Sequence, residues 1–144
     1  MKTLLTAMLC SVALCLSSCT KDEKPQPENA LTGDWRETEL NGTVRSLRFT
    51  ANHSFTFSVG STDGSGTIYN GTYLAKGDSL KVTVAQLLVQ EPGKPVQTTP
   101  STDRIYEKAT FSIKADTLTL KYITYPADAP VPTTAKFKRM MKID

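Results

Sequence analysis

The chain has few of the residues that build catalytic or metal centres. It contains one histidine, His53, and three cysteines in 144 residues. Metal sites usually draw on clustered histidines and cysteines, and acid–base or nucleophilic catalysis needs partner groups beside the reacting side chain. His53 lies in a short turn with no acid near it in the sequence. We therefore expect no enzyme activity, no metal site and no cofactor.

The sequence also lacks an apolar run long enough to cross a membrane as a helix. Residues 4–16 form a 13-residue run after Lys2, whereas a membrane-spanning helix needs about 20 apolar residues. A positive start, a short apolar run and small residues after it are typical of a secretory signal. We expect residues 1–18 to be removed with Cys10 and Cys15. Cys19 would then be the only cysteine, so the mature chain could form no disulfide.

A strong excess of one charge is absent as well. The chain has 17 basic and 14 acidic residues, a net charge of +3. A nucleic-acid surface should carry a clustered basic patch. The densest basic stretch, Lys136 to Lys142, is better interpreted as a charged strand and tail. We expect no nucleic-acid partner.

What is present begins with Cys19. Leu16, Ser17, Ser18 and Cys19 resemble the lipobox of bacterial lipoproteins. The resemblance implies cleavage before Cys19 and a diacylglycerol on its thiol, and two or three acyl chains hold a protein on a membrane almost irreversibly. It therefore implies a membrane partner through the lipid anchor. The alternative is an ordinary signal peptide that ends near a cysteine.

The residues after the cysteine concern the choice of membrane. Lys21, Asp22 and Glu23 resemble the export signal of surface lipoproteins from the Bacteroidetes group, which implies an outer-membrane lipoprotein that faces the cell exterior. The alternative is a solvated, charged linker. Residues 19–30 include Pro25 and Pro27 among polar residues, a composition that favours an extended tether.

Residues 31–144 are enough for one domain with its own core. No stretch of useful length shows the apolar period of a helix, whereas alternation of period two, which is typical of strands with one apolar face, recurs throughout. With residues 35–40 and 68–74, the alternating sets predict about eight strands: Leu47 and Phe49; Phe55, Phe57 and Val59; Leu80, Val82 and Val84; Phe111 and Ile113; Leu118, Leu120 and Tyr122; Ala135, Phe137 and Arg139.

Turn-forming residues separate these strands, so sequential antiparallel pairing is the simplest arrangement. An eight-stranded antiparallel up-and-down barrel would bury the apolar faces and leave no free edge; a two-sheet β-sandwich is the alternative. In the barrel the three long links, 60–66, 91–103 and 126–133, share one rim. Loops on a rigid scaffold often carry binding, so we expect contacts with a ligand or partner from Asp63, Tyr106, Tyr125 and Asp128.

A second resemblance concerns the domain. Gly33, Asp34 and Trp35 resemble the opening Gly-x-Trp motif of the lipocalin superfamily, and later residues, over about residues 31–140, resemble the small lipocalin-like domains of Bacteroidetes lipoproteins: Phe49, Phe55, Gly71, Tyr73, Leu118 and Leu120. The resemblance implies that Arg139 packs over Trp35, a structural contact. Glu37 and Glu39 are expected on a solvated face.

The barrel interior is expected to be filled, with at most a shallow mouth. An eight-stranded barrel holds either side chains or one small ligand, and fifteen bulky residues are predicted to point inward: Trp35, Leu47, Phe49, Phe55, Phe57, Tyr73, Leu80, Val82, Val84, Phe111, Ile113, Leu118, Leu120, Tyr122 and Phe137.

Two functional classes follow. The first is a non-catalytic binding module for a small apolar or glycan ligand, or for a protein partner, at the long-loop rim. The second is a structural or accessory subunit of a cell-envelope complex with a filled barrel and no small ligand. In addition, Ser79 and Thr117 lie in Asp-Ser/Thr-Leu tripeptides that resemble the O-glycosylation acceptor of exported Bacteroidetes proteins; turn chemistry at a strand start is the alternative.

Overall fold

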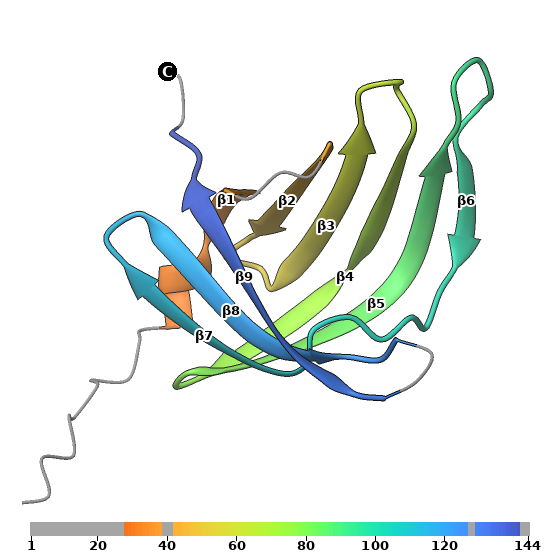
Figure 1. Cartoon of the computed structure of the whole chain (residues 1–144). Helices are drawn as coiled ribbons and strands as arrows, with labels where there is room; N and C mark the ends of the chain where they lie inside the picture. The colour runs from red at the N-terminus through yellow and green to blue at the C-terminus, as the bar shows by residue number, and fades with distance from the viewer. Residues whose placement is uncertain (1–27, 39–41, 127–128, 142–144) are drawn as a thin grey trace, which may run out of the picture.

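The computed structural model describes residues 28–38, 42–126 and 129–141 (Figure 1). These form a 3-10 turn and nine strands: η1 (Glu28–Leu31), β1 (Gly33–Glu37), β2 (Thr43–Phe49), β3 (Ser54–Ser61), β4 (Gly66–Lys76), β5 (Ser79–Gln90), β6 (Gln97–Pro100), β7 (Glu107–Lys114), β8 (Thr117–Thr124) and β9 (Val131–Arg139). Within this part of the chain, no helix is long and apolar enough to span a bilayer.

Eight of the strands close into an antiparallel barrel. The order is β4-β3-β2-β1-β9-β8-β7-β5, and β4 also pairs with β5, which closes the ring. This confirms the predicted up-and-down barrel and excludes the sandwich. The ninth strand, β6, folds back on the far half of β5 (Figure 1). The sequence analysis placed these residues in a loop because Gln97–Pro100 has no apolar face, and its four residues are all exposed.

The period-two alternation decides which side chains fill the barrel. Trp35 lies opposite Leu47 of β2 and Arg139 of β9, and Leu118 lies opposite Phe137. Residues opposite each other in a ladder point to the same face of the sheet, so the apolar members of each strand meet inside. Phe49, Phe55 and Tyr73 pack edge to face or tilted against one another, with ring centroids 4.9 and 5.4 Å apart.

The two ends of the barrel differ. The short turns β2–β3, β4–β5 and β7–β8 lie at one end with η1, and the β3–β4 and β5–β6 turns lie at the other with the end of β8 and the start of β9 (Figure 1). We call these the closed end and the open end. The side chain of Leu31, in η1, is fully buried at the closed end. The folded part thus includes residues 28–30, which the sequence analysis had assigned to the tether.

Candidate ligand-binding cavity

The barrel is filled in its closed half and hollow in its open half. Trp35, Phe49, Phe55 and Leu118 are all below 2% exposed and fill the closed half, and the equally buried Phe137 lines the cavity of the other half. The open half contains a cavity of about 560 Å³. The expectation of a filled interior is therefore wrong for the open half. There several inward side chains are short, including three that line the cavity: Val59, Thr124 and Thr133.

Aromatic rings form one wall of this cavity. Phe57 of β3 and Tyr69 of β4 are ladder partners, and their rings stack with centroids 5.8 Å apart and an interplanar angle of 19°. Tyr106 meets Phe57 at 5.5 Å and Tyr122 at 4.8 Å, both in edge geometry. Such rings present flat apolar faces and, in the tyrosines, a polar tip.

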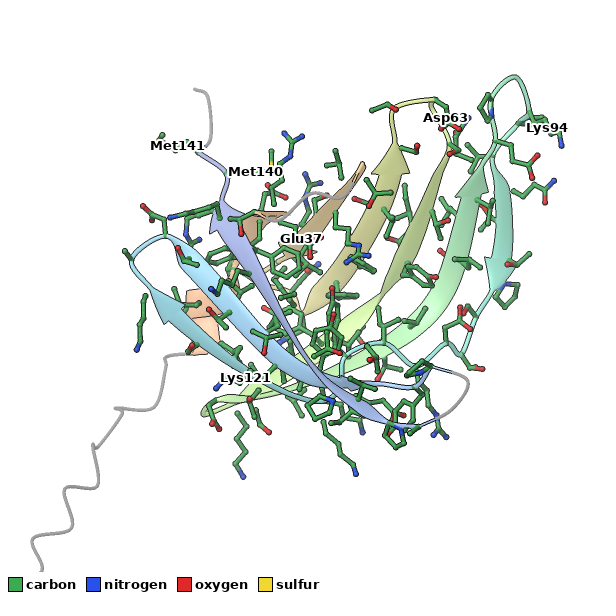
Figure 2. All side chains as sticks on the ribbon, in the orientation of Figure 1. Glu37, Asp63, Lys94, Lys121, Met140 and Met141 are labelled. Carbon is green, nitrogen blue, oxygen red and sulfur yellow. The ribbon has the colours of Figure 1, made fainter. Side chains whose placement is uncertain are left out.

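An ion pair supplies the charged groups. The Arg45 guanidinium lies 3.4 Å from the Glu37 carboxylate, and both residues line the cavity. Figure 2 shows Glu37 within the barrel. The Glu37 side chain is 9% exposed, whereas that of Arg45 is 47% exposed. A nearly buried carboxylate needs a charged or hydrogen-bonding partner. Arg45 is this partner, and part of its guanidinium group remains accessible.

The tyrosines beside this pair are held in their neutral form. Burial raises the pKa of Tyr106 well above its usual value, and the neighbouring Tyr122 and Glu37 raise it further. Burial also raises the pKa of Tyr122, where Arg45 acts in the opposite direction and Glu37 adds to the rise. Like ordinary tyrosines, both phenols are protonated at neutral pH, and their raised pKa values extend the neutral form to higher pH; each O–H can donate a hydrogen bond.

A second cavity, of about 870 Å³, lies at the seam between β5 and β7. The ladder between these strands has only two residue pairs, Ser79 with Thr110 and Leu80 with Ala109. The chain from Thr102 to Ala109 forms the opposite wall. Both cavities are lined by Arg104, Ile105, Tyr106 and Tyr125. The segment around Tyr106 therefore separates the barrel interior from the seam.

The predicted rim residues have different environments. Tyr125 is 55% exposed and lines both cavities. Tyr106 also lines both, although it is only 7% exposed, and its ring packs against Phe55 as well as Phe57. Asp128 lies outside the described residues. The structure thus brings Tyr106 and Tyr125 together at the cavity.

Asp63 lies apart from both cavities, in the β3–β4 turn at the open end (Figure 2). Its carboxylate accepts hydrogen bonds from the Ser65 backbone N–H, at 2.8 Å, and from the Ser65 hydroxyl, at 2.7 Å. These bonds lower the pKa of Asp63. Its visible role is to organise the turn.

The polar pair at the cavity was not predicted. Glu37 was expected on a solvated face, and no role was expected for Arg45. The signal for Glu37 was present, because it stands two residues after Trp35 and strand alternation puts both on the inner face. The charge of Glu37 favoured a position in solvent. Arg45 is brought beside Glu37 only by the pairing of β1 with β2.

Trp35 and Arg139 have the predicted structural contact. The Arg139 guanidinium lies 4.1 Å from the Trp35 ring centroid. It donates to the carbonyls of Thr32, at 2.9 Å, and Ala30, at 3.1 Å, while the indole N–H donates to the Leu31 carbonyl at 2.8 Å. The pair therefore fixes η1 to the closed end, away from the cavity.

The remaining predicted sites are not at the cavity. Ser79 and Thr117 begin β5 and β8, and the preceding Asp78 and Asp116 carbonyls accept backbone hydrogen bonds from the adjacent strands β7 and β9. His53 is exposed in the β2–β3 turn, with its ring 5.6 Å from Tyr73. Within the part of the chain that the structure describes, no three His, Cys, Asp or Glu side chains gather as a metal site would need. Cys19, Lys21, Asp22 and Glu23 lie outside the described residues.

Comparisons of the chain with protein families, with curated proteins and with solved structures found no match.

Proposed function

We propose that this protein is a non-catalytic, lipid-anchored binding module that holds one small ligand in the open half of its barrel. The observation that carries the proposal is the cavity itself. Its volume, about 560 Å³, lies within the range of about 300–1,000 Å³ typical of small-molecule sites. Such sites combine apolar walls with a few convergent polar groups, as Phe57, Tyr69 and the Glu37–Arg45 pair do here.

The lining favours an amphipathic ligand. The stacked rings of Phe57 and Tyr69 offer a flat face to a sugar ring or an apolar chain. The exposed part of Arg45 and the hydroxyl of Tyr122 can bind oxygen atoms of the same ligand. A glycan unit, or an apolar molecule with one polar head, meets both requirements.

The proposed location depends on the N-terminal residues. Cys19 would carry the lipid, and Lys21, Asp22 and Glu23 would direct the protein to the outer membrane with its domain on the exterior. The resemblances of these residues to a lipobox and to an export signal support this location. The open end lies opposite the end at which η1 begins (Figure 1), so the cavity mouth would face away from the anchor.

The test compares two tryptophan substitutions on one strand. Thr133 lines the cavity, whereas Thr134 is exposed on the outer face. The full-length protein is purified from producing cells with its anchor, and bound small molecules are measured by mass spectrometry. We expect a near-stoichiometric ligand in the wild type and in Thr134→Trp, and its loss in Thr133→Trp. If the wild type carries no ligand, or if the Thr133→Trp variant keeps it, the cavity is not the ligand-binding site.

One observation favours the second class, an accessory subunit. Met140 and Met141 are 47% and 92% exposed (Figure 2), and together with Ile68, 36% exposed, they line a groove of about 380 Å³ on the outer face. Exposed apolar patches often contact proteins. A reproducible protein companion in the same purification, lost on Met141→Asp and present without any small ligand, would establish this class instead.

A further inference from the structure

The outer face of the wall formed by β7, β8, β9 and part of β1 is cationic. Its outward positions carry Arg36, Lys114, Lys121, Lys136 and Lys138, all exposed. We call these five residues the cationic face. The other outward positions between them are hydroxyl residues: Thr110, Ser112, Thr117, Thr119 and Thr134. No acid stands among these ten positions.

The five charges are close and are not neutralised by other described residues. Arg36 and Lys138 are direct ladder partners, and Lys114 and Lys138 both lie opposite Thr117. Like charges directly opposite each other destabilise a sheet. None of the five forms an ion pair within the described residues. Of the acids beside this face, Asp34 pairs with Arg48 at 2.5 Å. Asp78 and Asp116, in the β4–β5 and β7–β8 turns, form no ion pair within the described residues. A bound anionic surface would remove this repulsion.

η1 lies at the closed end, next to the last residue of β9, the strand that carries Lys136 and Lys138. The Ala30 carbonyl accepts a hydrogen bond from Arg139, the residue after Lys138. Only residues 20–27 separate η1 from Cys19, and the nine steps from Cys19 to Glu28 reach at most about 30 Å. A lipid on Cys19 would therefore keep the cationic face within reach of the headgroups around it.

We propose that the cationic face lies against anionic lipid headgroups, with its lysines and Arg36 bound to phosphate. The barrel then has a preferred side towards the membrane. The inference rests on the proposed anchor and is independent of the cavity ligand. Each Lys or Arg close to an anionic bilayer strengthens association about fivefold, and the effect is screened by salt.

The experiment measures lysine accessibility in the full, lipid-anchored chain. The protein is placed in vesicles of phosphatidylcholine alone or with about one third phosphatidylglycerol, and amine labelling is read by mass spectrometry. Lys94, in the β5–β6 turn at the open end, is the internal control, far from Lys121 (Figure 2). We expect anionic vesicles to slow labelling of the four face lysines about fivefold or more, high salt to restore it, and Lys94 to be unaffected.

Two variants separate the face from general charge. Lys138→Gln should weaken protection of Lys114 and Lys136, whereas Lys94→Gln should leave it unchanged. Equal labelling in both kinds of vesicle, or equal protection of Lys94, would overturn the proposal. So would protection by a soluble anionic polysaccharide in place of anionic vesicles, which would assign the face to a glycan. Failure of the anchor itself is distinguishable, because the chain would then not remain with either kind of vesicle.

Discussion

At the scale of single residues, Gly71 of β4 has the least room for a side chain among the glycines that the structure describes. A Cβ atom at this position would stand 2.0 Å from the Thr83 carbonyl oxygen. Gly71 pairs with Phe55 on one side and Val84 on the other, and the β4–β5 register shifts between Asn70 and Gly71. Irregularities of this kind bend a strand and increase its twist, and here the glycine lets β5 approach.

Gly71→Ala should therefore destabilise the barrel by about 1–3 kcal/mol or more, because backbone atoms of β5 would have to move. Gly60→Ala in β3 is the matched control, since a Cβ there meets nothing within 4 Å and alanine is less costly than glycine within a strand. Urea unfolding of both variants measures the difference. Equal stabilities would contradict the account of the close approach.

The buried phenol of Tyr106 makes the free energy of unfolding depend on pH. Burial raises its pKa in the folded state above the usual value of 10.0, which the unfolded chain should retain. Between these two values the folded state holds a proton that the unfolded state loses, so the free energy of unfolding is undiminished below about pH 10 and falls as the pH rises above it.

In Tyr106→Phe this contribution is absent. Above about pH 10 the wild type should lose up to about 1.4 kcal/mol per pH unit more than the variant. Urea unfolding at about pH 9 and about pH 11 measures both slopes. Tyr122 contributes in the same direction in both proteins, so the difference isolates Tyr106. Parallel losses in the two proteins would show that the buried phenol does not control the alkaline limit.

At the scale of elements, the β5–β7 seam is the weakest part of the barrel. Lys81 to Val84 have ladder partners in β4 alone. In a central strand, the backbone groups of alternate residues bond to one neighbouring strand and those of the other residues bond to the second neighbour. The Phe111 N–H donates to the Asp78 carbonyl, so Asp78 and every second residue after it face β7. The N–H groups of Leu80, Val82 and Val84 thus face β7, and beyond Leu80 that ladder has ended.

Amide hydrogen exchange should report this one-sided pairing. We expect the Val82 N–H to exchange about tenfold or more faster than the Thr83 N–H, which faces Thr72 in β4, because opening free energies are low where backbone hydrogen bonds are missing. Two-dimensional NMR in deuterated solvent resolves the two amides. Similar rates for both would mean that the segment from Thr102 to Tyr106 protects the seam.

The contact of Arg139 with Trp35 joins three elements, η1, β1 and β9. Arg139→Lys keeps the charge but loses the planar fork that bonds two carbonyls and stacks on the indole. We expect a loss of about 1–3 kcal/mol in unfolding free energy. Arg48→Lys, in a more exposed pair with Asp34, should cost less than about 1 kcal/mol. Thermal unfolding of the two variants makes the comparison.

The elements themselves were largely predictable. Leu118 and Leu120, or Phe55 and Phe57, show their strands by alternation alone, because a strand with one buried face must alternate. β6 was not predictable, since Gln97–Pro100 buries no side chain and exists through its backbone pairing with β5. Of the cavity residues, Tyr106 and Tyr125 could be placed near the open end from link lengths, whereas Arg45 required the register of β1 against β2.

At the scale of the whole molecule, the proposed anchor decides where the barrel resides. Cys19→Ser should abolish incorporation of labelled fatty acid and move the protein from the membrane fraction to the soluble fraction, because each buried methylene contributes about 0.8 kcal/mol to membrane binding. Cys15→Ser, within the expected signal segment, should leave both readouts unchanged. A Cys19→Ser protein that still incorporates fatty acid would reject lipidation at this residue.

The sequence by itself determined the strands and their up-and-down order, because these depend on local alternation and short turns. The Trp35–Arg139 contact was implied by the resemblance of Gly33, Asp34 and Trp35 to the lipocalin motif. Tertiary structure alone decided that the barrel is hollow at one end, that Glu37 faces Arg45 inside it, and that five cations share one outer face. Each of these depends on the register between strands distant in the sequence and on how far the sheet closes, which no local pattern records.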